Sequence, residues 1–350
     1  MAVVQSRLEE FLGKAVCDMA AAASVPLMIL GDRLGLYRAM QDGQAMTPAE
    51  LAKKTNTAER YVREWLMNQA AGGYIDYDAA KQTFSLAPER AMALADENSP
   101  CYLQGAYEVI LSLFHDLEKV EGRFRAGDGM EWGEHCHHLF SGTARFFKPN
   151  YVGNLIANWL PSLDGVEAKL KAGGTVADVG CGFGHSTMLM AEAFPNSTFT
   201  GFDYHTPSIE SANKMAREAG LKNITFEPSG ATQFPGSGYD LVTCFDCLHD
   251  MADPTGVARQ VRKALKPEGA WMIIEPFAED QPERNLTPVG RMFYAASTMI
   301  CVPVSLAGKG PALGAQAGEK KLKEVVCAGG FTRFRRATQT PFNLVLEARP

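Results

Sequence analysis

The chain has 350 residues, of which 46% are hydrophobic and 21% charged, and this composition excludes a disordered protein. No run of about 18 uninterrupted apolar residues occurs, so we expect no membrane span. The net charge of −6 repels a phosphate backbone and disfavours nucleic acid as a partner.

Residues 1–100 are predicted to form a winged-helix domain that also dimerises. Thr47, Pro48 and Glu50 make a capping box with proline at the first helical position, which starts a helix. A second helix places four residues at helical spacing, and residues 72–86 alternate as two short strands around a polar turn. The four residues are Tyr61, Trp65, Leu66 and Gln69.

An Ala- and Met-rich apolar stripe opens the chain. It consists of Phe11, Ala15, Met19, Ala23, Leu27 and Leu30. Such a stripe is typical of a helix buried against another helix, here one from a second subunit, so a homodimer is expected. The N-terminus also lacks a basic start followed by an apolar run, which predicts a cytoplasmic protein with reduced cysteines.

Winged helices often bind DNA through their second helix, so a DNA-binding role has to be weighed. Residues 1–100 hold ten Lys and Arg against thirteen Asp and Glu. The second helix itself mixes Glu59 and Glu64 with Arg60 and Arg63. This balance favours a structural domain over a DNA reader.

Residues 101–165 are predicted to be a helical connector and substrate lid, rich in large aromatic side chains. A cluster in this segment suggests a metal site by composition, and its members are His135, Cys136, His137 and His138. Adjacent residues on a helix point in different directions and cannot chelate one ion together, so no metal is expected.

From Gly174 onward, short apolar runs alternate with amphipathic helices, which predicts a doubly wound α/β domain over residues 166–350. Seven strands are expected, at 175–179, 197–202, 223–227, 239–245, 270–275, 331–337 and 342–348. Cys244 and Cys247 form a single CxxC within one strand-like run, which indicates small buried residues rather than zinc or redox chemistry. Residues 308–318 are predicted to be a mobile loop.

The first strand of this domain ends in a glycine turn formed by Gly180, Gly182 and Gly184. Glycines let the backbone turn sharply and approach a ligand at the carboxyl end of a strand. The second strand ends in Asp203, where a carboxylate can hold a ribose diol. Asp178, two positions before the first glycine, can orient an ammonium group, which favours a methyl donor over a dinucleotide.

The motifs across residues 174–275 resemble those of class I S-adenosylmethionine-dependent methyltransferases in order and spacing. With the N-terminal winged helix, the layout is similar to that of the caffeate-type and hydroxyindole O-methyltransferases. The resemblance implies a seven-stranded Rossmann-like fold, S-adenosylmethionine as cofactor, a small-molecule substrate and a dimer. It implies that Asp178, Gly180 and Gly182 hold the methionine end of the cofactor, Asp203 the ribose and Tyr204 the adenine. Gly230 stands where the family often has an acid for the adenine amine, so Ala231, Thr232 and nearby groups would do that work. The remaining implied cofactor residues are Cys181 and Phe245.

The segment 245–251 resembles the LHDW segment of O-methyltransferases, whose histidine is a general base. His249 would take this role, because imidazole near its ordinary pKa of about 6.5 accepts a proton at neutral pH. Glu275, at the end of the fifth strand, would orient it. The alternative is that His249 caps a helix or lines the cofactor pocket.

We therefore expect a small-molecule methyltransferase acting on oxygen. The insert 285–318 contains Arg291, Phe293 and Tyr294, which favours an apolar or aromatic acceptor. One alternative is a regulator that binds DNA and senses S-adenosylmethionine without catalysis. An NAD-linked oxidoreductase is a third interpretation.

Overall fold

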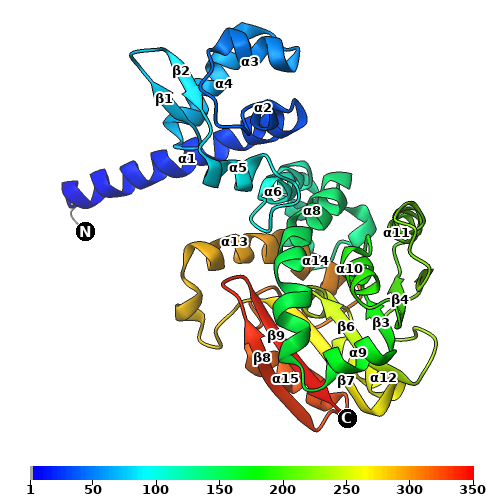
Figure 1. Ribbon diagram of the computed structural model, residues 1–350. Coiled ribbons are helices and arrows are strands. Elements are labelled where there is room, and N and C mark those ends of the chain that lie inside the picture. Colours follow the sequence, from blue (N-terminus) through cyan, green and yellow to red (C-terminus); the bar gives the residue numbers. More distant parts are fainter. Residues whose placement is uncertain (1–2) are drawn as a thin grey trace. The chain divides into compact units, whose positions relative to one another are not determined.

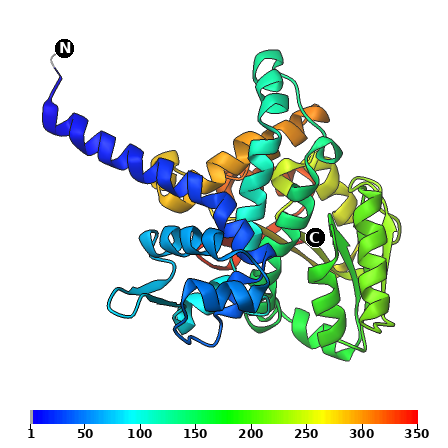
Figure 2. The same ribbon diagram turned by 90° about the horizontal axis from the view of Figure 1, so that it is seen from above.

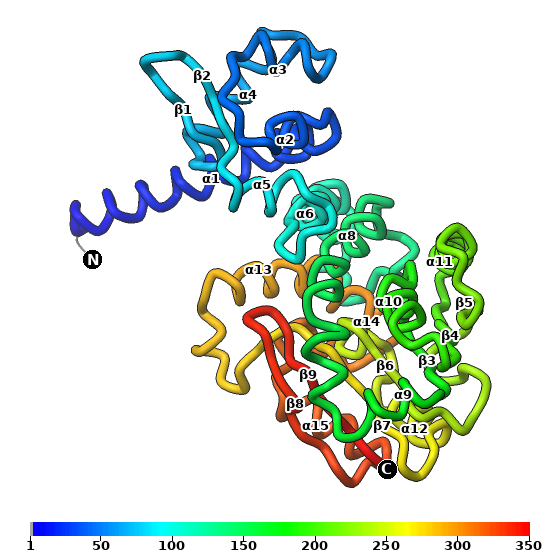
Figure 3. Tube along the Cα trace, viewed as in Figure 1, coloured from blue at the N-terminus to red at the C-terminus, as the bar shows by residue number. Residues whose placement is uncertain are grey.

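The computed structural model describes residues 3–350, and the chain divides into two compact units. Unit 1 comprises the described residues up to Ser112 together with His137–Pro149. Unit 2 comprises Leu113–Cys136 together with Asn150–Pro350. The predicted connector 101–165 contributes residues to both units, and Figures 1 and 3 allow the chain to be followed by colour.

Unit 1 is built from helices and one small hairpin. Its elements are α1 (Gln5–Arg33), α2 (Leu36–Ala39), α3 (Pro48–Thr55), α4 (Glu59–Ala71), β1 (Asp76–Asp78), β2 (Thr83–Ser85) and α5 (Pro88–Leu94). Two further helices, α6 (Gln104–His115) and α8 (His137–Asn154), hold residues of both units. The antiparallel pairing of β1 with β2 gives the predicted wing, so the winged-helix prediction is confirmed.

The helix starts and the core of unit 1 follow from the sequence. Thr47 accepts from the backbone N–H of Glu50, whose side chain accepts from the N–H of Thr47, so the predicted capping box forms. On α4, Trp65, Leu66 and Gln69 are buried as the spacing predicts. Tyr61 has the same helical spacing and is 81% exposed, because the core covers only part of this helix face.

Helix α1 is exposed over much of its length within the single chain (Figure 2). Its buried residues, Val25, Met28, Ile29 and Gly31, all lie near the C-terminal end. In the predicted stripe, Phe11 and Met19 are 64% and 62% exposed. By length and composition alone, Gln5–Arg33 and Pro288–Ala307 are also apolar enough to cross a membrane, although a core helix of a soluble protein meets the same criterion.

Unit 2 is organised around a seven-stranded sheet. Its strands are β3 (Thr175–Val179), β4 (Thr198–Asp203), β5 (Ile224–Pro228), β6 (Tyr239–Phe245), β7 (Leu265–Pro276), β8 (Arg333–Gln339) and β9 (Asn343–Arg349). The order across the sheet is β5-β4-β3-β6-β7-β9-β8. Neighbouring strands from β5 to β7 are parallel, whereas β9 runs antiparallel to both β7 and β8. All seven predicted strands are present, and the α/β fold class is confirmed.

Helices precede and connect these strands. Two precede the sheet, α7 (Leu117–Ala126) and α9 (Val166–Ala172), and the others are α10 (His185–Ala193), α11 (Thr206–Glu218), α12 (Pro254–Ala264), α13 (Pro288–Ala296), α14 (Val302–Ala307) and α15 (Gly318–Ala328). Single turns of 3-10 helix lie at η1 (Trp132–Glu134), η3 (Leu160–Ser162), η4 (Leu248–Asp250) and η5 (Pro282–Asn285). Two turns of π helix lie at η2 (Leu155–Trp159) and η6 (Ser297–Cys301).

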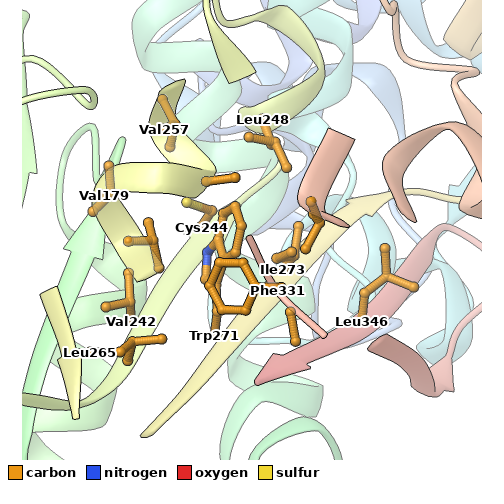
Figure 4. Close-up of a cluster of buried hydrophobic side chains, with 14 of the residues drawn as sticks. Val179, Val242, Cys244, Leu248, Val257, Leu265, Trp271, Ile273, Phe331 and Leu346 are labelled. Atoms are coloured by element: carbon orange, nitrogen blue, oxygen red, sulfur yellow. The ribbon is translucent and has the colours of Figure 1, made fainter. Parts of the chain in front are cut away.

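The main core of unit 2 lies between the sheet and the helices α12 and α15. Figure 4 shows Trp271 of β7 and Phe331 at its centre, with ring centroids 5.3 Å apart. Cys244 is fully buried in this cluster, as predicted for the CxxC segment, whereas Cys247 is only partly buried. Burial on this scale fixes the strand register, and the register places the carboxyl ends of β3, β4, β6 and β7 at one edge of the sheet.

The predicted mobile loop 308–318 is held by hydrogen bonds. The N–H of Ala312 donates to Ser305 Oγ at 3.1 Å, and that of Ala315 donates to Ser297 Oγ at 3.1 Å. These bonds attach the loop to the preceding helix, and its mobility stays a prediction.

Candidate active site

The turn between β3 and α10 is built on three glycines with left-handed backbone angles. Gly180, Gly182 and Gly184 have φ values of 76°, 52° and 74°. A Cβ on Gly180 would lie 2.8 Å from Cys247 Sγ, and one on Gly184 would lie 2.3 Å from the ring of Phe226. At Gly182 a Cβ would meet no atom within 4 Å, so the middle of the turn faces open space. Side chains are therefore excluded at the ends of the turn, whereas its centre can approach a ligand.

Asp178 lies at the base of this turn and is fully buried. Its carboxylate accepts hydrogen bonds from Ser186 Oγ at 2.8 Å, Thr187 Oγ1 at 2.6 Å and Thr243 Oγ1 at 2.9 Å. Burial raises the pKa of Asp178, and the hydroxyl donors oppose the rise. These bonds tie the turn to α10 and β6, which favours a positioning role. The direct contact with the methionine end stays a prediction.

Asp203, the last residue of β4, closes the other side of the turn. Its Oδ2 accepts from the N–H of Gly182 at 2.9 Å, and its Oδ1 accepts from the N–H of His205 at 2.8 Å. Burial raises its pKa, while these backbone donors and the charge of His205 favour the ionised form. The next residue, Tyr204, is 57% exposed, so its ring has a face available for a planar ligand.

The turn after β5 comes to the same edge of the sheet. The N–H of Ser229 donates to the carbonyl of Asp203 at 2.9 Å, and the backbone N–H of Gln233 donates to the carbonyl of Gly230 at 3.0 Å. Gly230 and Ala231 are half-buried, whereas Thr232 is exposed.

Two of the predicted cofactor residues face the protein interior. The side chain of Cys181 packs with Ile209 and Phe226. Phe245 is buried, and its ring meets that of Tyr151 edge-on at 5.1 Å between centroids. A direct contact of either side chain with the cofactor stays a prediction.

The ends of β6 and β7 bring the predicted catalytic pair together. His249 Nδ1 lies 2.6 Å from Glu275 Oε2, and the N–H of Leu248 donates to Glu275 Oε1 at 2.9 Å. Both side chains of the pair are buried. The carboxylate thus accepts from the ring and from the backbone beside it, which fixes the orientation of the imidazole. The other ring nitrogen, Nε2, lies 3.3 Å from Cys301 Sγ.

The protonation of His249 differs from the expectation of an ordinary pKa. Burial alone would lower its pKa, but the Glu275 carboxylate and Cys301 together raise it well above 6.5. The ordinary pKa was expected for a solvated imidazole, whereas His249 is buried beside the carboxylate of Glu275. A proton acceptor in this position therefore needs a more alkaline pH than free imidazole.

Sequence reasoning missed three residues near His249. Asp246 has a left-handed φ of 51°, accepts from Asn343 Nδ2 at 3.0 Å and has a pKa raised well above its ordinary value by burial. Burial also raises the pKa of Asp250 to about 7. Both carboxylates flank His249 in the printed sequence and could have been noted there. Cys301 lies 52 residues away with no motif around it, so only the fold reveals it.

Comparison with known proteins agrees with this arrangement. Residues 170–327 match a family model described as a methyltransferase domain, and residues 22–96 match one described as an Rv2258c-like winged HTH domain. The chain is 31% identical over 145 residues to 27-O-demethylrifamycin SV methyltransferase of Amycolatopsis mediterranei, an alignment covering 39% of this chain and 50% of that protein. It is 30% identical over 164 residues to the ubiquinone biosynthesis O-methyltransferase of Paracidovorax citrulli, covering 46% and 65% respectively. The chain thus spans about half to two thirds of the length of these two curated relatives.

Solved structures match over the full length. An O-methyltransferase family protein from Burkholderia thailandensis has a TM-score of 0.69 at 17% identity, with 100% of this chain and 99% of that chain covered. Human N-acetylserotonin methyltransferase in complex with SAM has a TM-score of 0.66 at 15% identity, with the same coverage. At these identities the likeness establishes the fold, a winged helix combined with a class I methyltransferase domain.

Proposed function

We propose that this chain, which combines an Rv2258c-like winged-helix domain with a methyltransferase domain, methylates a small molecule with S-adenosylmethionine as donor. Oxygen is the proposed acceptor atom. The observation that carries the proposal is the buried pair of His249 and Glu275 at the same sheet edge as the glycine turn and Asp203. A base next to a nucleoside site is what methyl transfer to a hydroxyl group requires.

The residues of the donor site fit the proposed cofactor. Open space at Gly182 gives room for a ligand against the backbone, and the Asp203 carboxylate suits the two ribose hydroxyls. The partly exposed ring of Tyr204 suits stacking on adenine. The bound donor supplies an electrophilic methyl group on a sulfonium.

His249 removes the proton of the acceptor hydroxyl. Glu275 accepts from Nδ1, which leaves the lone pair of the neutral ring on Nε2. General base catalysis of this kind contributes about two to four orders of magnitude in rate. The raised pKa makes His249 a strong acceptor that is available only once the solution is alkaline enough to deprotonate it.

An apolar or aromatic acceptor suits the segment that follows β7. Phe293 and Ile300 are buried on the helical stretch that also carries Cys301. The names of the two curated relatives, a rifamycin and a ubiquinone O-methyltransferase, also support oxygen methylation of such a molecule.

The same proposal includes a cytoplasmic homodimer. The exposed apolar face of α1 suits a second copy of the chain, because it is long, amphipathic and largely uncovered within one chain. The exposed members of this face are Leu8, Phe11, Leu12, Val16 and Met19. We do not propose DNA binding, since Arg60 and Arg63 on α4 pair with Glu64 and Glu59 at 2.5 Å.

Calorimetry with S-adenosylhomocysteine tests the donor site. We expect micromolar binding by the wild type, loss of binding by Asp203→Ala and no change for Asp164→Ala, whose carboxylate is exposed and distant in sequence from the turn. Failure of the wild type to bind, or full binding by Asp203→Ala, would refute the cofactor assignment.

Consumption of S-adenosylmethionine in the presence of each member of a phenol library tests the reaction. On an acceptor found in this way, His249→Asn should keep the affinity for S-adenosylhomocysteine and lower the rate by about two to four orders of magnitude. Asparagine preserves a hydrogen bond but cannot serve as a base. A His249→Asn protein that retains most of its activity would rule out the base.

A further inference from the structure

The thiol of Cys301 occupies the side of His249 on which an acceptor would have to approach. Glu275 accepts from Nδ1, so the neutral ring carries its lone pair on Nε2, and Cys301 Sγ lies 3.3 Å from that atom. The raised pKa of His249 means that the resting ring is protonated at neutral pH, so Nε2–H donates to Cys301 Sγ in this contact. Both residues are buried, which keeps water from competing for the same ring nitrogen.

Cys301 reaches this place because the helix that carries it is wound irregularly. The stretch Pro288–Ala307 is helical throughout, but its middle, Ser297–Cys301, is a turn of π helix between α13 and α14. A π turn inside an α-helix is rare and often marks a functional site. Pro303 follows two residues later and has no N–H for the helical ladder, which favours irregular winding here.

Polar contacts hold this turn from several directions. Ser297 Oγ accepts from the N–H of Ala315 at 3.1 Å, and Ser305 Oγ donates to the carbonyl of Met251 at 3.1 Å. The carbonyl of Pro303 accepts from the N–H of Met130 at 2.9 Å. The contact of Ser305 with Met251 ties the helix to the loop that carries His249. These hydrogen bonds therefore fix the distance between Cys301 and His249.

We propose that Cys301 is a positioning residue of the acceptor site: its sulfur accepts from Nε2–H of the protonated His249, holds the ring in place and gives way to the hydroxyl of the methyl acceptor. This inference rests on the proposed function. A thiol suits the task because its sulfur is a weak acceptor, so the hydroxyl of the substrate replaces it at little cost. The contact also marks where the reacting oxygen has to sit.

The charge state of His249 reports on this contact. Four titratable groups face the ring, namely Glu275 on β7, Asp246 after β6, Asp250 on η4 and Cys301 on η6. Cys301 acts in the same direction as Glu275 and raises the pKa of His249 against the effect of burial. Removal of the thiol should therefore lower the pKa of His249. Loss of packing alone should not lower it.

Histidine titration by NMR in the donor-free protein tests the contact without any substrate. The chain has seven histidines, and the signal of His249 is identified by its absence in His249→Asn. We expect Cys301→Ala to lower the pKa of His249 by about one unit and Cys301→Ser to keep it near the wild-type value. Cys327→Ala is the control, because Cys327 is exposed on α15. Should Cys301→Ala fold poorly, Cys301→Val removes the sulfur acceptor while filling the space.

Kinetics then test the role in transfer. In Cys301→Ala, the acidic limb of the pH profile of kcat/KM should move to lower pH by the same amount as the NMR-measured pKa of His249. The affinity for S-adenosylhomocysteine should stay unchanged. An unchanged pKa of His249 in Cys301→Ala, or an unmoved limb in an active enzyme, would overturn the inference. Lack of methyl transfer by the wild type would instead refute the proposed function, so the two failures are distinguishable.

Discussion

Replacement of Glu275 by glutamine is the sharpest perturbation of the proposed catalytic pair. The carboxylate accepts on both oxygens, from Leu248 N–H at 2.9 Å and from His249 Nδ1 at 2.6 Å. A glutamine amide has one oxygen and one NH2 group, so it cannot accept in both places.

The two orientations of the amide differ in cost. If the NH2 group faced Leu248, two buried donors would oppose each other at a cost of about 1 to 3 kcal/mol. If it faces His249, Nδ1 becomes the acceptor and the ring proton moves to Nε2. The second orientation is favoured, and it leaves Nε2 without a lone pair. We therefore expect Glu275→Gln to lower kcat by about two to four orders of magnitude, the full contribution of a general base.

The assay is methyl transfer at saturating acceptor, together with calorimetry for S-adenosylhomocysteine. Donor affinity should stay within about threefold, because Glu275 is not among the residues assigned to the donor. The acidic limb of the pH profile should also be lost, because a neutral ring with its proton on Nε2 no longer serves as the base. Glu268→Gln, on the exposed part of the same strand, is the control. A Glu275→Gln enzyme within threefold of the wild-type kcat would refute the orientation argument.

Three further predictions concern the fold around the site. Gly184→Ala should lose about 2 to 4 kcal/mol of unfolding free energy in urea, since a Cβ would lie 2.3 Å from Phe226 at a φ of 74°. The control Gly220→Ala has a similar φ of 70° but nothing within 4 Å of the added Cβ, so it should lose only about 1 kcal/mol. Equal losses in the two variants would contradict the clash. The folded-state pKa of Asp250 is raised to about 7, so its contribution to stability is full at low pH and is lost between about pH 4 and 7. Asp250→Asn should therefore flatten the pH dependence of the unfolding free energy in this range, by up to about 1.4 kcal/mol per pH unit. An unchanged slope would argue against the raised pKa, with Asp164→Asn as the control. Phe11→Glu with Val16→Glu should convert the proposed dimer to a monomer in light scattering, while Leu286→Glu, at an exposed site in unit 2, should not. A dimer that survives the double change would exclude α1 as its interface.

Local rules predicted the elements and the glycine turn well. The glycine turn, Asp203 and the seven strands could be identified because strand patterns and left-handed turns depend on neighbouring residues. The capping box at Thr47 and Glu50 is predictable for the same reason. The pairing of His249 with Glu275 was predicted from their places at adjacent strand ends, through the family resemblance.

What depends on distant contacts could not be predicted. The bonds from Ser186, Thr187 and Thr243 to Asp178 involve helix and strand residues that no short motif connects. The raised pKa of His249 depends on burial, which only the assembled site determines. The exposure of Tyr61 shows the same limit, because helical period predicts a face but not how much of that face the core covers.

Because of the π turn at Ser297–Cys301, the number of residues in this helix determines which side chain faces His249. Each residue of an α-helix advances the chain by about 100°, so a deletion of one residue here would rotate everything beyond it by nearly a third of a turn. Ser305 would then leave the carbonyl of Met251, and a different side chain would face His249. A gap of a single residue in an alignment of this segment would therefore signal a change of acceptor more clearly than many substitutions around it.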